Sequence, residues 1–255
     1  MRPKKWWIDG GLLVGFGVWT LLLALRTPLL GMDLAVRDWS ESHWPPGAHG
    51  TARVINYVGQ GGQVLLPLAA LMAAFFAWRR RSVRPLLPVA AALILTYLTI
   101  GPLKVLTRRA AADDRTIPHP EWLFHDPGGL SYPSGHVVNS IIWYGVYAIL
   151  LGSLVTGFWR GLVRFGAPIV VLCTTTYLTW HWVSDGVGAI MVGLFLDRLM
   201  RRIPWDHIPL GNRPWTAPAQ LEPDPDQRSR SFFPSRPAGP CGGLPPQSRS
   251  PSPKA

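Results

Sequence analysis

The sequence predicts an all-α integral membrane protein, a six-helix bundle followed by a disordered C-terminal tail. Three observations support this prediction: an apolar composition, six long apolar runs, and basic residues in the connections between them. Of the 255 residues, 48% are hydrophobic and only 15% are charged, which is few charges for a soluble domain. The two cysteines, Cys173 in an apolar run and Cys241 in the tail, offer neither a disulfide framework nor metal-ligand spacing.

Six apolar runs have the length of membrane spans or nearly so, since a span needs about 20 mostly apolar residues. They are Ile8–Leu25, Val64–Trp78, Leu86–Leu103, Val137–Val155, Val163–Trp180 and Val183–Met200. Basic residues before the first run also fit a signal peptide. However, Leu25-Arg26-Thr27-Pro28 lacks the small residues of a cleavage site, so we expect an uncleaved first helix.

Basic residues occupy alternate connections, and such clusters mark the cytoplasmic side of a membrane protein. They are Arg2, Lys4, Lys5, Arg79, Arg80, Arg81, Arg84, Arg160, Arg164, Arg198, Arg201 and Arg202. We therefore expect a multi-pass protein of the cytoplasmic membrane with both termini in the cytoplasm. The loop Asp33–Gly62, the long loop after Lys104 and the turn at His181 then lie outside. This topology explains the formal charge of +11 better than nucleic-acid binding does, so we expect no nucleic-acid partner.

Two regions depart from this alternation. The long outer loop carries Arg108, Arg109 and Arg115, for which anion binding is one explanation. The other is charge balance with the acidic residues of the same loop, which are Asp113, Asp114, Glu121 and Asp126. After Ile203 the chain becomes rich in Pro, Ser, Gly and Arg, a composition that buries too little apolar surface to order a chain. We therefore divide it into a membrane domain, residues 1–203, and a disordered cytoplasmic tail, residues 204–255.

The segment Pro133-Ser134-Gly135-His136 precedes an apolar run and is typical of a helix N-terminus, with Pro133 or Ser134 near the cap. Free backbone N–H groups and the helix dipole favour an anion at this position. Gly135 permits close approach of a ligand, Ser134 adds a hydroxyl donor, and His136 lies within reach. The alternative is a simple cap followed by an interfacial histidine.

His181 and Asp185 are four residues apart, a spacing that brings side chains together on a helix. A carboxylate bonded to one ring nitrogen fixes the tautomer and raises the basicity of the other nitrogen, as a nucleophile or base requires. Two alternatives remain: His181 belongs to an interfacial aromatic belt with Trp180 and Trp182, or Asp185 only satisfies a helix dipole. The occurrence of Lys104 at the same membrane face favours a phosphoryl-transfer site.

These motifs resemble the type 2 phosphatidic acid phosphatase family, which is related to the vanadium haloperoxidases. The family motifs are Lys-x6-Arg-Pro, Pro-Ser-Gly-His and Ser-Arg-x5-His-x3-Asp, and the resemblance covers roughly residues 64–202. It implies a six-helix membrane bundle with the site at one membrane face. It also implies that His181 is a nucleophile forming a phosphohistidine, that Asp185 orients it and that His136 protonates the leaving oxygen. The chemistry implied uses no metal or cofactor.

The same resemblance implies that Lys104, Ser134 and the Gly135 amide hold the phosphate. Both motif arginines are absent, because the expected positions are Ala111-Ala112 and Thr174-Thr175. The loss matters because Arg makes planar, bidentate contacts with phosphoryl oxygens. We expect Arg108 or Arg109 to act as the substitute ligand.

The leading functional hypothesis is a lipid phosphate or diphosphate phosphatase acting on the outer leaflet, with phosphatidate, phosphatidylglycerol phosphate or a polyprenyl diphosphate as substrate. A second hypothesis is a phosphotransferase that uses a lipid or sugar hydroxyl as acceptor. Sphingolipid-synthase-like relatives keep both histidines and the Asp but lack the third-motif arginine. A third hypothesis is a non-catalytic protein that binds an anionic lipid.

Overall fold

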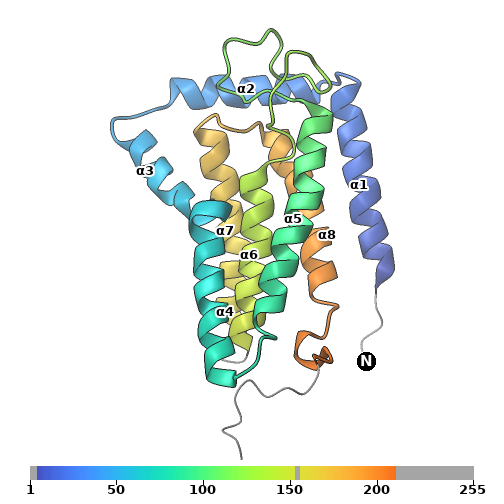
Figure 1. Cartoon of the computed structure of the whole chain (residues 1–255). Helices are drawn as coiled ribbons and strands as arrows, with labels where there is room; N and C mark the ends of the chain where they lie inside the picture. Colours follow the sequence, from blue (N-terminus) through green and yellow to red (C-terminus); the bar gives the residue numbers. More distant parts are fainter. Residues whose placement is uncertain (1–4, 153–155, 211–255) are drawn as a thin grey trace, which may run out of the picture. The chain divides into compact units, whose positions relative to one another are not determined.

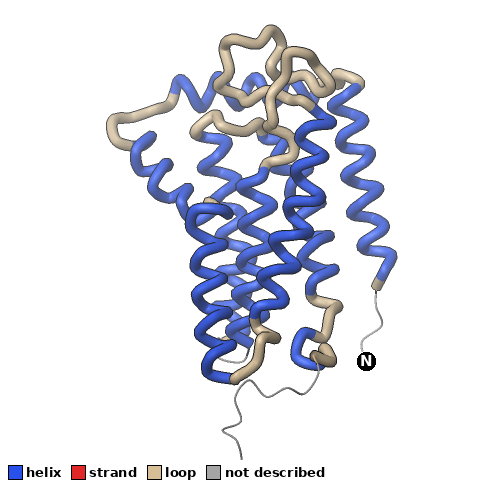
Figure 2. The backbone as a smooth tube through the Cα atoms, in the orientation of Figure 1, coloured by secondary structure: helices blue, strands red, loops and turns tan. Residues whose placement is uncertain are grey.

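The computed structural model describes residues 5–152 and 156–210. Within these residues the chain forms α-helices joined by loops and short helical turns, with no strand (Figures 1 and 2). The helices are α1 (Trp6–Ala24), α2 (Leu29–Ser42), α3 (Ala48–Asn56), α4 (Leu66–Arg80), α5 (Leu86–Thr107), α6 (Gly135–Leu151), α7 (Gly157–Tyr177) and α8 (Val183–Met200). The predicted all-α class is therefore confirmed.

The six apolar runs appear as α1, α4, α5, α6, α7 and α8, with shifted ends. Helix α5 continues through Pro102 to Thr107, so it includes Lys104 in its last turn. Helix α6 ends at Leu151, where Gly152 adopts a positive φ of 49°. Helix α7 begins at Gly157, six residues before the apolar run, because Arg160 and Gly161 interrupt the hydrophobic pattern of its first turns.

The segment expected to be a loop, residues 33–62, is mostly helical, which corrects that prediction. Helix α2 holds the first part and runs across one end of the bundle, and α3 follows it (Figure 1). A 3-10 turn (Tyr57–Gly59) and a π-helical turn (Gly61–Leu65) then lead directly into α4. Both α2 and α3 are amphipathic and shorter than a span, so a search for long apolar runs does not detect them.

The centre of the bundle is α6, which packs against α4, α5, α7 and α8. Its side chains make up much of the core, including Val137, Val138, Ile142 and Val146, each at most 2% exposed. Helix α1 packs mainly on α8 at the edge of the bundle (Figure 1). The start of α6, which carries the Pro-Ser-Gly-His segment, is therefore held from several sides.

By length and composition, three helices of the described chain can cross a membrane: Trp6–Ala24, Gly61–Arg80 and Leu86–Thr107. Helix α6 is apolar but shorter, with 17 residues. The protein is an integral membrane protein of the predicted bundle type. Many large apolar side chains on its outer helices are exposed, such as Leu71, Tyr97 and Phe158, as expected of surfaces that face lipid.

The basic clusters gather at the end of the bundle away from α2. Arg198 and Arg202 bind Asp9 near the start of α1, and Arg84 donates to the Ile208 carbonyl. A short 3-10 turn, Trp205–His207, lies within the segment predicted to be a disordered tail. The remainder of that predicted tail, residues 211–255, lies outside the described residues.

Candidate active site

The Pro-Ser-Gly-His segment opens α6 as predicted, with Ser134 as its N-cap. The Ser134 hydroxyl oxygen accepts from the Val137 N–H at 3.5 Å, and the backbone N–H of Ser134 donates to the Asp185 carbonyl at 3.2 Å. Beneath it, Tyr132 is fully buried, stacks on Phe16 and shares a 2.7 Å hydrogen bond with Thr20. Burial raises the pKa of the Tyr132 phenol. The start of α6 is thus anchored to α1 and α8.

His181 lies in the turn between α7 and α8, which is held by hydrogen bonds to α7. The N–H groups of Trp180 and His181 donate to the Thr175 carbonyl at 3.1 and 3.4 Å. Trp182 is 1% exposed and donates its indole N–H to the Ala110 carbonyl at 2.9 Å. Trp182 is therefore packed inside the protein and is not an exposed residue of an aromatic belt.

His181 and Asp185 are in contact, as their spacing predicts, although His181 precedes the helix. His181 Nδ1 lies 3.3 Å from Asp185 Oδ2. Ser131 joins the pair: its hydroxyl donates to Asp185 Oδ2 at 2.5 Å and lies 3.0 Å from His181 Nδ1. Asp185 is fully buried and His181 is 8% exposed. The other ring nitrogen of His181, Nε2, does not contact this pair and is available to react with a substrate.

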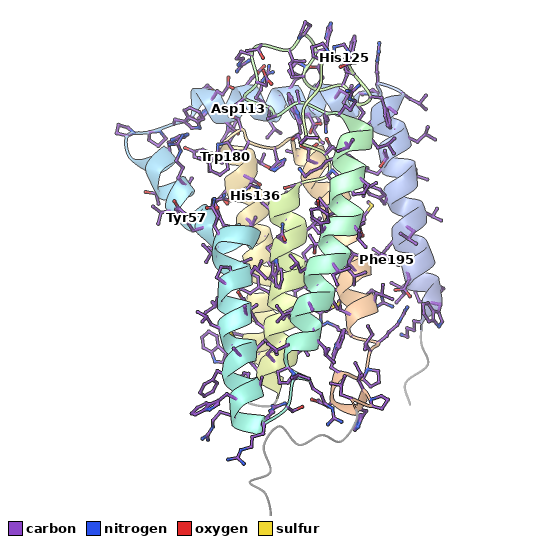
Figure 3. All side chains as sticks on the ribbon, viewed as in Figure 1. Tyr57, Asp113, His125, His136, Trp180 and Phe195 are labelled. Atoms are coloured by element: carbon purple, nitrogen blue, oxygen red, sulfur yellow. The ribbon has the colours of Figure 1, made fainter. Side chains whose placement is uncertain are left out.

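The two histidines predicted for the site are brought together from α6, which carries His136, and from the turn before α8, which carries His181. His136 Nδ1 lies 3.4 Å from His181 Nε2, and the rings meet edge to face with centroids 5.5 Å apart. The Trp180 ring also lies beside His136, with the ring centroids 5.9 Å apart. Figure 3 shows His136, Trp180 and Asp113 at the end of the bundle covered by α2 and the long loop.

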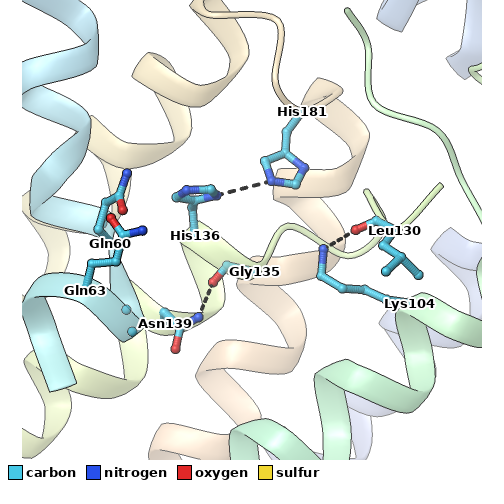
Figure 4. Close-up of a pocket in the computed structure, with 11 residues that line it drawn as sticks. Gln60, Gln63, Lys104, Leu130, Gly135, His136, Asn139 and His181 are labelled. Carbon is cyan, nitrogen blue, oxygen red and sulfur yellow. Dashed lines mark hydrogen bonds between the residues drawn. The ribbon is translucent and has the colours of Figure 1, made fainter. Parts of the chain in front are cut away.

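A cavity of about 500 Å³ opens beside the two histidines (Figure 4). Its walls come from the turns before α4, from the last turn of α5 and from the start of α6. The lining residues are Gly59, Gln60, Gly61, Gly62, Gln63, Lys104, Leu130, Gly135, His136, Asn139 and His181. The cavity is lined by one lysine, two histidines and the three carboxamides of Gln60, Gln63 and Asn139, and no carboxylate is among these residues.

Lys104 reaches this cavity from the last turn of α5. Its ammonium group donates to the carbonyl oxygens of Leu130 and Ser131. A Cβ added to Gly135 would lie 3.5 Å from Lys104 Cε, an ordinary van der Waals contact, so the lysine side chain lies directly beside Gly135. The predicted cation and the predicted glycine therefore meet at the start of α6.

The remaining predicted residues lie outside the cavity lining. Arg108 is about half-exposed and pairs with Asp126 at 3.2 Å, as charge balance within the loop predicts. Arg109 is fully buried and binds the carboxylates of Asp33 and Asp185. Ser134 is fully buried directly behind the lining residue Gly135.

The positions of the missing family arginines hold small residues. Ala111 is partly buried, and Thr175 is fully buried with its hydroxyl bonded to the Val171 carbonyl at 2.8 Å. Neither position presents a charged group. The positive charge beside the cavity comes from Lys104 and from the N-terminus of α6.

Four residues of this region were not identified from the sequence. Ser131 bridges the histidine and the aspartate, Asp33 binds Arg109, and Gln60 and Gln63 line the wall opposite His136 (Figure 4). An available signal was the run Gly59-Gln60-Gly61-Gly62-Gln63, which interrupts apolar sequence with flexible and amide residues. Asp33 gave another signal as a carboxylate close to apolar residues.

Comparison with known proteins agrees with the motifs. The model of the PAP2 superfamily matches residues 85–209. A solved structure described as the first transmembrane PAP2 type phosphatidylglycerolphosphate phosphatase from Bacillus subtilis matches with a TM-score of 0.61. The two are 21% identical, and the match covers 76% of this chain and 94% of that one. No curated protein matches the chain. Residues 85–209 therefore match the PAP2 superfamily, and this region contains the histidines, aspartate and lysine predicted for the site.

Proposed function

We propose that the protein is a metal-independent lipid phosphate or diphosphate phosphatase that works through a phosphohistidine at His181. The observation that carries this proposal is the meeting of His181 Nε2 and His136 at 3.4 Å beside a cavity that also receives Lys104. A nucleophile, a proton donor and a cation in one cavity are the groups that phosphoryl transfer from an ester requires. The superfamily match supports the same chemistry.

In the first step, His181 Nε2 forms a bond to phosphorus while the bond from phosphorus to the ester oxygen breaks. His136 gives its proton to that oxygen, which leaves as the lipid alcohol. In the second step, a water molecule attacks phosphorus, His136 takes the water proton and the phosphorus–nitrogen bond breaks. Inorganic phosphate leaves and both histidines return to their starting forms.

Lys104, the Gly135 amide and Ser134 are the proposed phosphate ligands. The dipole of α6 adds to the charge of Lys104 at the place where the phosphoryl oxygens would lie. Gln60 and Gln63 on the opposite wall supply neutral donors and acceptors for the rest of the headgroup. Arg108 stays a candidate ligand on the rim, since its side chain is about half-exposed.

The site is proposed to face the outside of the cytoplasmic membrane, with both termini inside. The clustering of basic residues at the other end of the bundle supports this orientation. A cysteine at Thr116, an exposed loop position, in a protein whose native cysteines are replaced by serine, tests it. Labelling of intact cells by a membrane-impermeant maleimide is expected, and labelling only after lysis contradicts it.

The catalytic proposal is tested with purified protein and a panel of phosphatidate, phosphatidylglycerol phosphate and a polyprenyl diphosphate. Phosphate release should persist in EDTA and be lost in both His181→Ala and His136→Ala. Loss of activity in EDTA, or activity retained in both variants, contradicts the mechanism. Asn56→Ala, a buried polar substitution outside the cavity, controls for a general loss of folding.

A phosphotransferase is the second candidate, favoured by the replacement of the third-motif arginine by Thr175 and by the neutral amides of the cavity wall. In that case a hydroxyl of a second lipid or a sugar takes the place of water. The same lipid panel separates the two functions, because a hydrolase releases phosphate without an added acceptor. A transferase yields a new phosphorylated lipid or sugar only when the acceptor is present. A protein that only binds lipid gives neither product.

A further inference from the structure

Arg109 lies behind the catalytic pair, and its guanidinium group is occupied there by protein groups. It is fully buried and makes four hydrogen bonds through its three nitrogens. Nη1 donates to Asp185 Oδ1 and to Ser184 Oγ at 2.6 Å each, Nη2 to Asp33 Oδ2 at 2.7 Å, and Nε to the Glu121 carbonyl at 2.9 Å. A guanidinium group held in this way is not presented to a substrate in the cavity.

The two oxygens of Asp185 have different partners. Oδ1 accepts from Arg109, whereas Oδ2 faces His181, the Ser131 hydroxyl and the Trp182 N–H. Since the Ser131 proton is donated to Asp185, Ser131 Oγ is an acceptor toward His181 Nδ1. Nδ1 must then carry the hydrogen, which leaves the lone pair on Nε2, the nitrogen beside His136.

Asp33 extends this network to α2. Its Oδ1 accepts from the Ser184 N–H at 3.0 Å, and its Oδ2 accepts from Arg109 and from the Ser184 hydroxyl. A helix that lies across the end of the bundle is thereby tied to the first turn of α8, where Asp185 stands. The segment between α5 and α6 joins as well, because the Ser131 N–H donates to the Arg109 carbonyl at 2.8 Å.

The charges of this group do not cancel. Two carboxylates and one guanidinium, all with side chains 0% exposed, leave one net negative charge next to His181. Attack through Nε2 gives the His181 ring a positive charge, and an adjacent buried negative charge stabilises it strongly because the surroundings are poorly polarisable. With Asp185 and Arg109 alone the net charge would be zero.

We propose that Asp33, Arg109 and Ser131 are positioning residues that fix the His181 tautomer and supply the negative charge its reaction needs. Arg109 acts through Asp185 and does not bind the phosphate. This inference rests on the proposed function for its effect on turnover. The predicted tautomer of His181 is independent of turnover, so it can be measured whether or not a given lipid is hydrolysed.

The experiment uses full-length protein in detergent with the variants Asp33→Asn, Arg109→Lys and Ser131→Ala. Arg201→Lys is the matched control, since it changes an arginine bound to a carboxylate at the opposite end of the bundle. Nitrogen-15 spectra of labelled histidine, with His181 assigned by His181→Ala, report the tautomer. Phosphate release reports kcat and KM, and competition by inorganic phosphate reports the affinity of the site for phosphate.

We expect the wild-type His181 to carry its hydrogen on Nδ1, and Ser131→Ala and Asp33→Asn to populate the other tautomer. The expected fall in kcat is about 10- to 100-fold, the range seen when the partner that orients a histidine is lost. Inhibition by inorganic phosphate should change less than about twofold in all variants, including Arg109→Lys. The Arg201→Lys control should match the wild type in every measurement.

An unchanged His181 tautomer in both Ser131→Ala and Asp33→Asn contradicts the proposed positioning role of these residues. If inhibition by inorganic phosphate weakens by about tenfold or more in Arg109→Lys, Arg109 instead binds the phosphate directly. If the wild type releases no phosphate from any lipid, the proposed function fails. The tautomer measurement then decides the network by itself, so the two failures are distinguishable.

Discussion

The two ends of the bundle differ in the ratio of buried carboxylates to the arginines that pair with them. At the site end, Asp33 and Asp185 share one arginine, Arg109, and all three side chains are 0% exposed. At the other end, Asp9 is shared by Arg198 and Arg202, and a second carboxylate is shared by another two arginines. The site end therefore keeps a spare negative charge and the other end keeps spare positive charge.

The difference in exposure suggests what each arrangement does. The arginines of the opposite end are 15–31% exposed, so water or lipid headgroups can balance their excess charge. This fits the proposed cytoplasmic side, where anionic lipids attract basic residues. The excess negative charge of the buried group formed by Asp33, Asp185 and Arg109 has no access to solvent, and His181, which contacts Asp185, can become positive beside it. The two arrangements therefore agree with the proposed orientation, in which one end meets the cytoplasmic membrane surface and the other carries the proposed reaction.

The largest expected contrast comes from replacing one arginine at each end. Arg109→Met leaves two buried carboxylates unpaired and should lower the free energy of unfolding by about 3–5 kcal/mol. Arg201→Met leaves its carboxylate paired with Arg164 and should cost about 0–1 kcal/mol. Thermal unfolding in detergent measures both. Equal losses would show that the two ends do not differ in the way their charges are solvated.

A smaller effect is expected from the loop that carries Arg109. A Cβ added at Gly128 would meet the backbone carbonyl oxygens of Arg108 and His125, so the loop must shift. Gly128→Ala should cost about 1–3 kcal/mol and lower kcat together with stability. At the opposite end, a Cβ at Gly145 meets only side-chain atoms. Gly145→Ala should therefore lower stability with little effect on kcat per folded molecule, and an equal loss of kcat would contradict this.

Tyr132 provides a pH-dependent test of the packing under the site. Its pKa is raised by burial, so the stability it contributes is fully present below about pH 10, the value of a free tyrosine. That contribution is lost as the pH rises further through the folded-state value. Tyr132→Phe should cost about 0.5–1.5 kcal/mol at neutral pH through the lost Thr20 hydrogen bond. The variant should also lose less stability than the wild type above pH 10. Parallel pH curves for the two proteins would contradict the role of burial.

The smallest effect is expected at the rim of the site. Arg115 pairs with Glu41, and these side chains are 57% and 31% exposed. Arg115→Ala should change the free energy of unfolding by about 0–1 kcal/mol, with less effect at high salt. Turnover should stay near that of the wild type. A large drop in turnover would place Arg115 in the substrate path and weaken the contrast between buried and exposed arginines.

Much of the geometry of the candidate site was predictable because it is local. The cap at Ser134 follows from the residues beside it, and the His181–Asp185 contact follows from their spacing. The apolar runs likewise predicted where six of the helices lie, and three helices of the described chain are long and apolar enough to cross a membrane.

The environment of the arginines was not predictable in this way. Arg109 lies next to Arg108 in the chain, yet one is buried against two carboxylates and the other is about half-exposed. The partners of Arg109 lie about 75 positions away, on α2 and α8. Such contacts depend on how helices pack, and α2 itself was expected to be a loop. The substitute-ligand role expected for Arg109 therefore gives way to the positioning role proposed above.

The most direct test is to trap the covalent intermediate. Purified protein is mixed with a lipid carrying a radiolabelled phosphate, stopped with denaturant within one turnover, and examined for label on the protein. The account predicts label that survives alkali but not acid, as a phosphorus–nitrogen bond does, present in the wild type and absent in His181→Ala. Label retained in His181→Ala, or hydrolysis with no labelled protein under these conditions, would contradict it.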